Sequence, residues 1–133
     1  MLLLTTIAFA QKDKLAGTWE LMQQPEVPLN VLRNFDIQGN YIQIVSIKSG
    51  AIITVHAAYK QFEDGKLTEQ ISFSTYPGNT GKTFNFNYRL SNENGRELLI
   101  LEKGAKLVNG HVIPEWREVW RKVEDAKVED AKE

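Results

Sequence analysis

Two histidines are the side chains of this sequence best suited to acid–base chemistry near neutral pH. His111 follows Asn109 and Gly110 in a predicted turn, where we expect an exposed loop residue. His56 lies within a predicted strand, and a pairing with Glu69 across neighbouring strands is the one acid–base dyad that the spacing offers. We predict that the protein is not an enzyme and has no catalytic residue, and we keep this dyad as a lesser alternative.

Metal, thiol and phosphate chemistry find little support in the residue pattern. The sequence contains no cysteine, which excludes disulfides, thiolate nucleophiles and Cys-ligated metals. The two histidines are far apart, and the scattered carboxylates add no metal-ligand spacing. The segment 78–83 ends in Gly-Lys-Thr, but it lacks the first glycine of a phosphate loop and precedes a predicted strand. We therefore expect no cofactor and no metal.

The charge balance argues against nucleic acid and membranes as partners. The 133 residues include 16 Lys and Arg against 17 Asp and Glu, a formal net charge of -1. Proteins that bind nucleic acid or anionic membranes carry a basic surface, which this balance does not supply. No apolar run approaches the roughly 20 residues that cross a bilayer. The length predicts one domain with a sizeable core, and the composition specifies no oligomeric state.

Both ends of the chain differ in composition from the middle. Residues 1–10 are uncharged and end in Ala-Phe-Ala, which is typical of a signal peptide with its cleavage site. The usual positive charges before the apolar stretch are missing, which fits a true start a few residues upstream; a buried first strand is the alternative. Residues 124–133 form a charged tail, solvated or, alternatively, helical and partner-docking. We expect an exported protein, periplasmic or secreted, with its folded domain over 11–123.

The middle of the chain has the pattern of antiparallel β structure. Segments rich in Val, Ile, Thr, Tyr and Phe alternate with turns rich in Gly and Asn. The pattern predicts eight strands, at 18–24, 31–36, 41–48, 51–62, 67–76, 82–91, 97–103 and 115–123. Short links make consecutive strands antiparallel neighbours, and closure removes the exposed edges of such a meander. We predict an all-β fold, an eight-stranded antiparallel up-and-down β-barrel, in which the two-proline segment 24–30 could form a lid.

The first and last strands carry a matched pair of motifs. Gly17-Thr18-Trp19 opens the first strand, and the last strand contains an Arg and Trp cluster over 116–121. A guanidinium stacked on an indole gains about 0.5–2 kcal/mol and would join these two strands. We expect Arg121 to stack on Trp19, with Arg117, on the same face of the strand, as the second choice.

This layout resembles the lipocalins and the wider calycin barrels, in which a Gly-x-Trp strand plugs the closed end and a basic residue of the last strand lies across the indole. It is also similar to a small family of exported, lipocalin-like domains of unknown function. Three motifs carry that similarity: Gly17-Thr18-Trp19, Thr68-Glu69-Gln70-Ile71 and Glu118-Val119-Trp120-Arg121. The resemblance spans the chain from Leu15 to about Val123. It implies a lipocalin-like fold with a cavity, and assigns no ligand or reaction.

An eight-stranded barrel is just wide enough to be filled by its own side chains or to hold one small ligand. We expect non-catalytic binding of a small apolar or amphipathic ligand, because apolar pockets with a few polar groups are the usual small-molecule sites. The candidate lining residues are Tyr59, Phe73 and Tyr88, with His56 and Glu69 as polar contacts. The alternative is a filled barrel that serves as an envelope interaction module and docks a protein or glycan on its outer surface.

Overall fold

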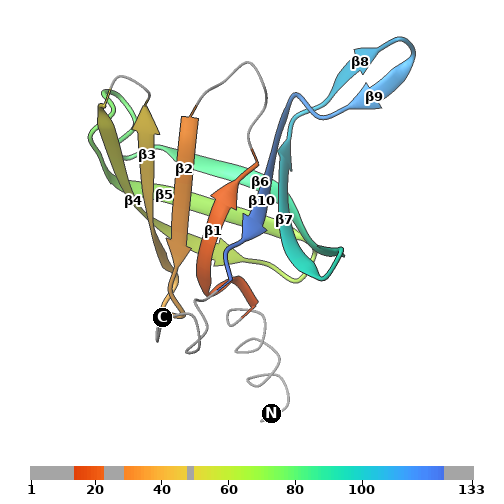
Figure 1. Cartoon of the computed structure of the whole chain (residues 1–133). Coiled ribbons are helices and arrows are strands. Elements are labelled where there is room, and N and C mark those ends of the chain that lie inside the picture. Colours follow the sequence, from red (N-terminus) through yellow and green to blue (C-terminus); the bar gives the residue numbers. More distant parts are fainter. Residues whose placement is uncertain (1–13, 23–28, 48–49, 125–133) are drawn as a thin grey trace, which may run out of the picture.

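The computed structural model describes residues 14–22, 29–47 and 50–124, which are almost entirely β (Figure 1). Ten strands are formed: β1 (Gly17–Leu21), β2 (Leu29–Phe35), β3 (Asn40–Ile47), β4 (Ile52–Gln61), β5 (Lys66–Ser74), β6 (Thr83–Glu93), β7 (Arg96–Lys103), β8 (Lys106–Val108), β9 (His111–Ile113) and β10 (Trp116–Lys122). No helix among these residues is long and apolar enough to cross a membrane. The predicted signal peptide, most of segment 24–30 and all of the tail except Glu124 lie outside the described residues.

Eight of these strands close into a barrel in the order β1-β10-β7-β6-β5-β4-β3-β2. Each strand pairs antiparallel with its neighbours along the chain, and β1 pairs with β10 to close the ring. The predicted eight-stranded antiparallel barrel is therefore confirmed. Alternation within the strands explains it: on β6, Phe86 is buried while Asn85 and Asn87 are exposed, so one face of the strand meets the core and the other meets solvent.

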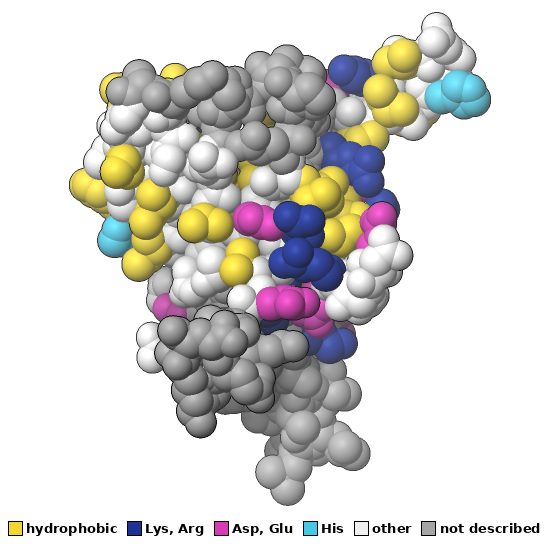
Figure 2. Space-filling view, in the orientation of Figure 1, with side chains coloured by type: hydrophobic (Ala, Val, Ile, Leu, Met, Phe, Trp, Pro, Cys, Tyr) yellow, Lys and Arg dark blue, Asp and Glu magenta, His cyan; other side chains and the backbone are white. Residues whose placement is uncertain are grey.

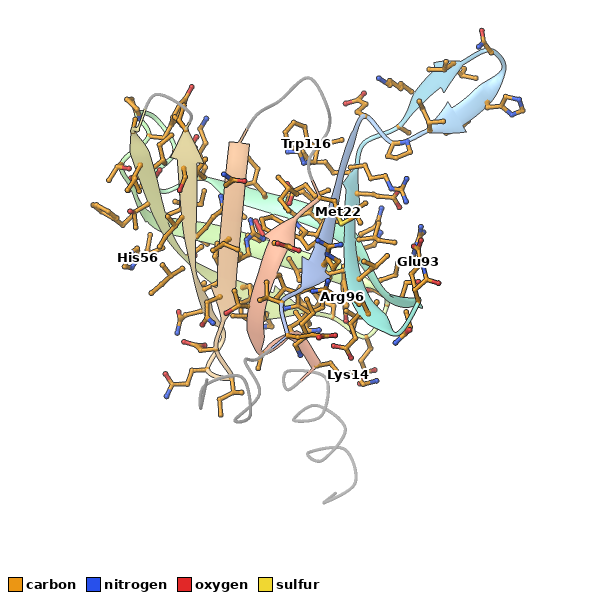
Figure 3. The ribbon with its side chains drawn as sticks, viewed as in Figure 1. Lys14, Met22, His56, Glu93, Arg96 and Trp116 are labelled. Carbon is orange, nitrogen blue, oxygen red and sulfur yellow. The ribbon has the colours of Figure 1, made fainter. Side chains whose placement is uncertain are left out.

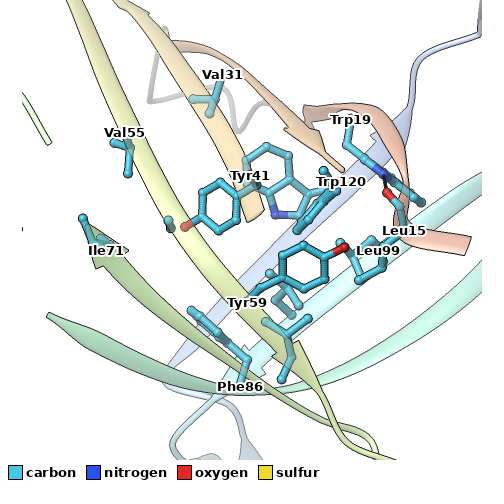
Figure 4. Packing of buried hydrophobic residues seen from close by; sticks show 14 residues of the cluster. Leu15, Trp19, Val31, Tyr41, Val55, Tyr59, Ile71, Phe86, Leu99 and Trp120 are labelled. Atoms are coloured by element: carbon cyan, nitrogen blue, oxygen red, sulfur yellow. Dashed lines mark hydrogen bonds between the residues drawn. The ribbon is translucent and has the colours of Figure 1, made fainter. Parts of the chain in front are cut away.

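The antiparallel order gives the barrel two different ends. β1, β3, β5 and β7 finish at one end, where β2, β4, β6 and β10 begin; we call this end the mouth and the other the closed end. Trp19 and Leu15 are fully buried toward the closed end, and the Trp19 indole N–H donates a hydrogen bond to the Leu15 carbonyl at 2.9 Å (Figure 4). The part of the barrel next to the closed end is therefore filled by side chains.

The basic partner of Trp19 is Lys122. The two residues are opposite each other in the β1–β10 ladder, and the Lys122 Nζ lies 5.6 Å from the centre of the indole. The lysine stem also explains the glycine of the motif. Gly17 has a φ of +122°, and a Cβ there would lie 3.1 Å from Lys122 Cε. A larger side chain at position 17 would be strained and would also displace the lysine.

The prediction that Arg121 stacks on Trp19 is wrong. Arg121 points outward, where its Nε donates a hydrogen bond to Glu20 at 2.8 Å. Arg117, the second choice, also points outward and pairs with Glu102 at 3.5 Å. The physical reason is the two-residue period of a strand: Trp120 faces the core, so Arg121 must face away from it. A band of basic and acidic side chains on the outside results (Figure 2).

The hairpin β8–β9 lies where the sequence predicts only a turn at Asn109 and Gly110. Figure 1 shows it projecting from the barrel beside the mouth, between β7 and β10 in the chain. Its apolar side chains face solvent, with Leu107 73% and Val112 71% exposed. Each of its strands has three residues, which is too short to show the alternation of apolar and polar residues that identifies a strand in a sequence.

Candidate functional site

A charged network lies inside the barrel. Arg33 on β2 is 4% exposed, and its Nη1 donates to Glu69 Oε1 on β5 at 2.6 Å. The Arg33 Nε and Nη2 both donate to Gln43 Oε1 on β3, at 2.9 and 2.6 Å. The Tyr41 hydroxyl donates to the second Glu69 oxygen at 3.2 Å. The network thus joins three strands through the barrel interior, and both buried charges have polar partners.

Aromatic rings enclose the guanidinium. The Arg33 Cζ lies 4.1 Å from the centre of the Tyr41 ring and 4.5 Å from that of the Trp120 ring, and both rings belong to the central cluster (Figure 4). Phe35 lies farther away, at 5.6 Å. The faces of aromatic rings attract a guanidinium, so stacking on them replaces part of the stabilisation that water gives to the charge. Arg33 with these rings forms what we call the floor, the filled layer beneath the mouth.

Burial and charge shift the titration of this network. Burial alone would lower the pKa of the Arg33 guanidinium, but the carboxylates of Glu69 and Glu118 raise it above its ordinary value, so Arg33 stays charged. Burial raises the pKa of the Glu69 carboxyl, against the lowering effect of Arg33. Burial also raises the pKa of the Tyr41 hydroxyl, so Tyr41 remains a hydrogen-bond donor.

Glu118 on β10 links the floor to the mouth. One of its oxygens accepts the Trp120 indole N–H at 2.8 Å, and the other accepts the Trp116 indole N–H at 2.7 Å. Trp120 is 2% exposed, whereas Trp116 is 51% exposed. Figure 3 shows Trp116 close to the start of β10, at the mouth. The carboxylate therefore fixes the orientation of one buried and one accessible tryptophan.

Four apolar side chains line the mouth above the floor. Leu21, Val45, Ile53 and Phe84 lie on β1, β3, β4 and β6, and each is half-buried against the core cluster. On β1, β4 and β6 the next inward side chain toward the closed end is fully or almost fully buried. Along these three strands the inner side chains thus change from buried to half-buried within one step, and we call the half-buried set of four the cup.

The structure divides the predicted site residues between the two faces of the barrel wall. Glu69 and Tyr59 are buried inside, and Tyr88 is half-buried. Tyr59 lies toward the closed end, where its hydroxyl donates to the Asp36 carbonyl at 2.7 Å. Burial raises the Tyr59 pKa to about 12. The tyrosines therefore belong to the packed part of the barrel and not to the mouth.

His56 and Phe73 are exposed on the outer face, where their rings meet edge to face at 5.6 Å. Figure 3 shows His56 on the outside of the barrel. A β-bulge causes this. The strand period predicts Phe73 on the inner face with Glu69, but the β4–β5 register shifts beside His56, so that Ser72 is the extra residue. Phe73 consequently lies outside, opposite His56. His56 and Glu69 lie on opposite faces of the barrel wall, and they form no acid–base dyad.

Arg33 is not among the predicted site residues, although the sequence carries a signal for it. Val31 and Phe35 are buried on the same face of β2, and Glu69 has the same position between Leu67 and Ile71 on β5. One basic and one acidic residue, each on the apolar face of its strand, indicate a buried ion pair, because single buried charges are costly.

The described part of the outer surface includes two hollows and an apolar area. The larger hollow, about 440 Å³, lies along β5, β6 and the end of β7, and the smaller, about 240 Å³, lies along β2 to β5. The apolar area, which we call the outer patch, is seen on the left in Figure 2. It comprises Leu32, Ile42, Ile44, Ile52 and Phe73, which are 44–64% exposed.

Within the described ranges, no group of three or more His, Cys, Asp or Glu residues is placed to hold a metal ion. No curated protein sequence matches this chain significantly. A family model described as a domain of unknown function (DUF4488) matches residues 14–131, which include the whole barrel. The chain therefore belongs to the DUF4488 family.

Proposed function

We propose that this protein is an exported, lipocalin-like barrel that binds one small apolar or amphipathic molecule in its mouth, without catalysis. The observation that carries the proposal is the set of partly buried apolar side chains that face the barrel axis there. Each Å² of apolar surface left in water forgoes about 25 cal/mol. A ligand that covers Leu21, Val45, Ile53 and Phe84 would recover that stabilisation.

The floor limits how deep a ligand can enter. On β3, Val45 stands two residues above Gln43, which bonds to Arg33. Two residues of a strand span about 7 Å, so one ring or a few carbons of a ligand fit below Val45, and the rest of the molecule extends toward the mouth.

The interior carboxylates support binding without catalysis. Both Glu69 oxygens accept hydrogen bonds, from Arg33 and Tyr41, and both Glu118 oxygens accept indole N–H groups. Carboxylates whose oxygens are already occupied are poorly placed to take a proton from a ligand. The uncharged segment 1–10 supports the proposal of export.

A pair of neighbouring variants tests the proposal. Val45→Trp fills the cup, whereas Ile44→Trp adds the same bulk one residue away, where the side chain is 44% exposed outside the barrel. The probe is N-phenyl-1-naphthylamine, a neutral molecule that fluoresces in apolar sites. We expect saturable binding to the wild type and to Ile44→Trp, and at least about tenfold weaker binding to Val45→Trp. No saturable binding to the wild type, or equal binding to both variants, would overturn the proposal.

The outer patch favours a second candidate function, an interaction module that docks a protein or glycan in the envelope. Contiguous apolar side chains on the surface of a folded protein often mark a site where a partner binds. This candidate predicts a stable oligomer or a partner complex, detected by light scattering. A substitution such as Ile42→Ser should dissociate it and leave probe binding in the mouth unchanged.

A further inference from the structure

One cation faces the mouth from the wall opposite the aliphatic side chains. Lys103 is the last residue of β7, where Leu99 and Leu101 of the same face belong to the core cluster. Its partner across the β7–β10 ladder is Trp116, the half-exposed tryptophan of the mouth. Strand alternation therefore directs the Lys103 side chain into the barrel opening and not to the outer surface.

Three aromatic rings surround the Lys103 ammonium. Its Nζ lies 4.7 Å from the centre of the Phe84 ring, 5.4 Å from Phe86 and 5.5 Å from Trp116. Rings attract a cation, but they do not replace the strong acceptors that its three N–H groups need. This arrangement holds the ammonium at the edge of the cup with its hydrogen-bonding capacity unused by the rings.

The neighbouring carboxylates do not pair with Lys103. The Glu115 side chain packs against Gly104, the residue after Lys103, and makes no ion pair with the ammonium. Glu102, next to Lys103 in the sequence, points outward and pairs with Arg89 at 3.6 Å and Arg117 at 3.5 Å. Glu118 accepts the two indole N–H groups. Across residues 14–22, 29–47 and 50–124, no carboxylate lies within 4.0 Å of the Lys103 ammonium.

We propose that the mouth selects an amphipathic anion. Its anionic head group binds the Lys103 ammonium beside Trp116, and its apolar body covers Val45 and Ile53 on the opposite wall. This inference rests on the proposed binding function and adds the charge of the ligand to it. Arg33 pairs with Glu69, whereas Lys103 has no ion-pair partner among the residues that the structure describes. A charge-assisted hydrogen bond to a carboxylate is the interaction that this ammonium can make most strongly.

Three ligands with one chain and different heads test the inference: octanoate, octanol and octylammonium. Each displaces N-phenyl-1-naphthylamine from the purified full-length chain, and the displacement midpoint gives its affinity. We expect octanoate to bind about tenfold more tightly than octanol, the size of one charged hydrogen bond, and octylammonium to bind more weakly than octanol.

Matched lysine variants assign the preference to one residue. Lys103→Met keeps the length of the side chain and should bind octanoate no better than octanol, while still binding octanol, which shows that it is folded. Lys103→Arg should retain the preference. Lys60→Met is the control, because Lys60 also lies over a ring, that of Phe62 at 5.3 Å, but on an exposed strand position.

The outcomes separate the two proposals. Equal affinity of the wild type for octanoate and octanol overturns the anion inference and leaves the binding function standing. A preference that Lys103→Met retains, or that Lys60→Met loses equally, overturns the role of Lys103. Failure of the neutral probe to bind the wild type overturns the binding function itself.

Discussion

Replacement of Arg33 by methionine should destabilise the barrel strongly. The arginine is 4% exposed, bonds to Glu69 and Gln43, and lies between two aromatic rings. Methionine preserves much of the packing against those rings but leaves the Glu69 carboxylate buried without its cation. Removing one member of a buried ion pair costs about 3–5 kcal/mol, so we expect Arg33→Met to lower the free energy of unfolding by that amount at pH 7.

The pH dependence of that loss follows from Glu69. Burial raises its pKa above the ordinary 4.5, so its contribution to stability is complete below that pH and is lost as the pH rises through the folded-state pKa. Arg33 lowers this pKa, so its removal enlarges the shift. The deficit of Arg33→Met should therefore be larger at pH 7 than at pH 5. Replacing both partners, as Arg33→Met with Glu69→Leu, should cost less than Arg33→Met alone, because no buried charge remains unpaired.

Urea unfolding followed by tryptophan fluorescence measures these differences. Arg89→Met is the matched control: its side chain is 60% exposed and its pair with Glu102 spans 3.6 Å. An exposed pair of this kind contributes less than about 1 kcal/mol. A loss below about 1 kcal/mol for Arg33→Met at pH 7, or the same deficit at pH 5 and pH 7, would refute the reasoning.

Trp19→Ala should lower the free energy of unfolding by about 3–5 kcal/mol because the indole is fully buried, whereas Arg121→Ala should cost less than about 1 kcal/mol because its pair with Glu20 is partly exposed. Chemical denaturation compares the two, and equal losses would contradict the Lys122 assignment. Burial raises the pKa of Tyr59 to about 12, so stability that is complete below the ordinary value of 10 should be lost as the pH rises through 12. Absorbance titration of the wild type against Tyr59→Phe measures this, and a Tyr59 signal near pH 10 would disprove it. Replacing residues 106–113 with a short Gly-Ser link should change stability by less than about 1 kcal/mol, because their apolar side chains are exposed; a larger melting shift would show that the hairpin contacts the barrel.

The barrel could be predicted from the sequence because strand period and turn chemistry act locally. The eight predicted strands overlap the eight barrel strands, and the Gly and Asn turns between them dictate antiparallel neighbours. The errors arose where one residue decides the outcome. Lys122 replaced Arg121 at the indole because register sets the face of each residue, and Phe73 moved outside because of the extra Ser72 in β5.

The candidate site was harder to predict because it depends on distances around the barrel. Glu69 was among the predicted polar residues, but its partner Arg33 lies three strands away, and only closure of the sheet brings the two charges within 2.6 Å. Lys103 is not among the predicted site residues. The alternation within its strand predicts that Lys103 faces the barrel interior. The three rings around its ammonium come from two other strands, and a local sequence pattern does not predict that grouping.

The pairing of β1 with β10 also decides which end of the barrel lies next to anything attached to the first or last strand. The Val123 N–H donates to the Thr18 carbonyl at 2.8 Å, so the first and last barrel strands have their outer ends side by side, at the end opposite the mouth. An affinity handle, a fused domain or a surface linker attached through either end would therefore hold the barrel by its base. In such an arrangement, the cup of Leu21, Val45 and Ile53 lies at the end of the barrel far from the attachment.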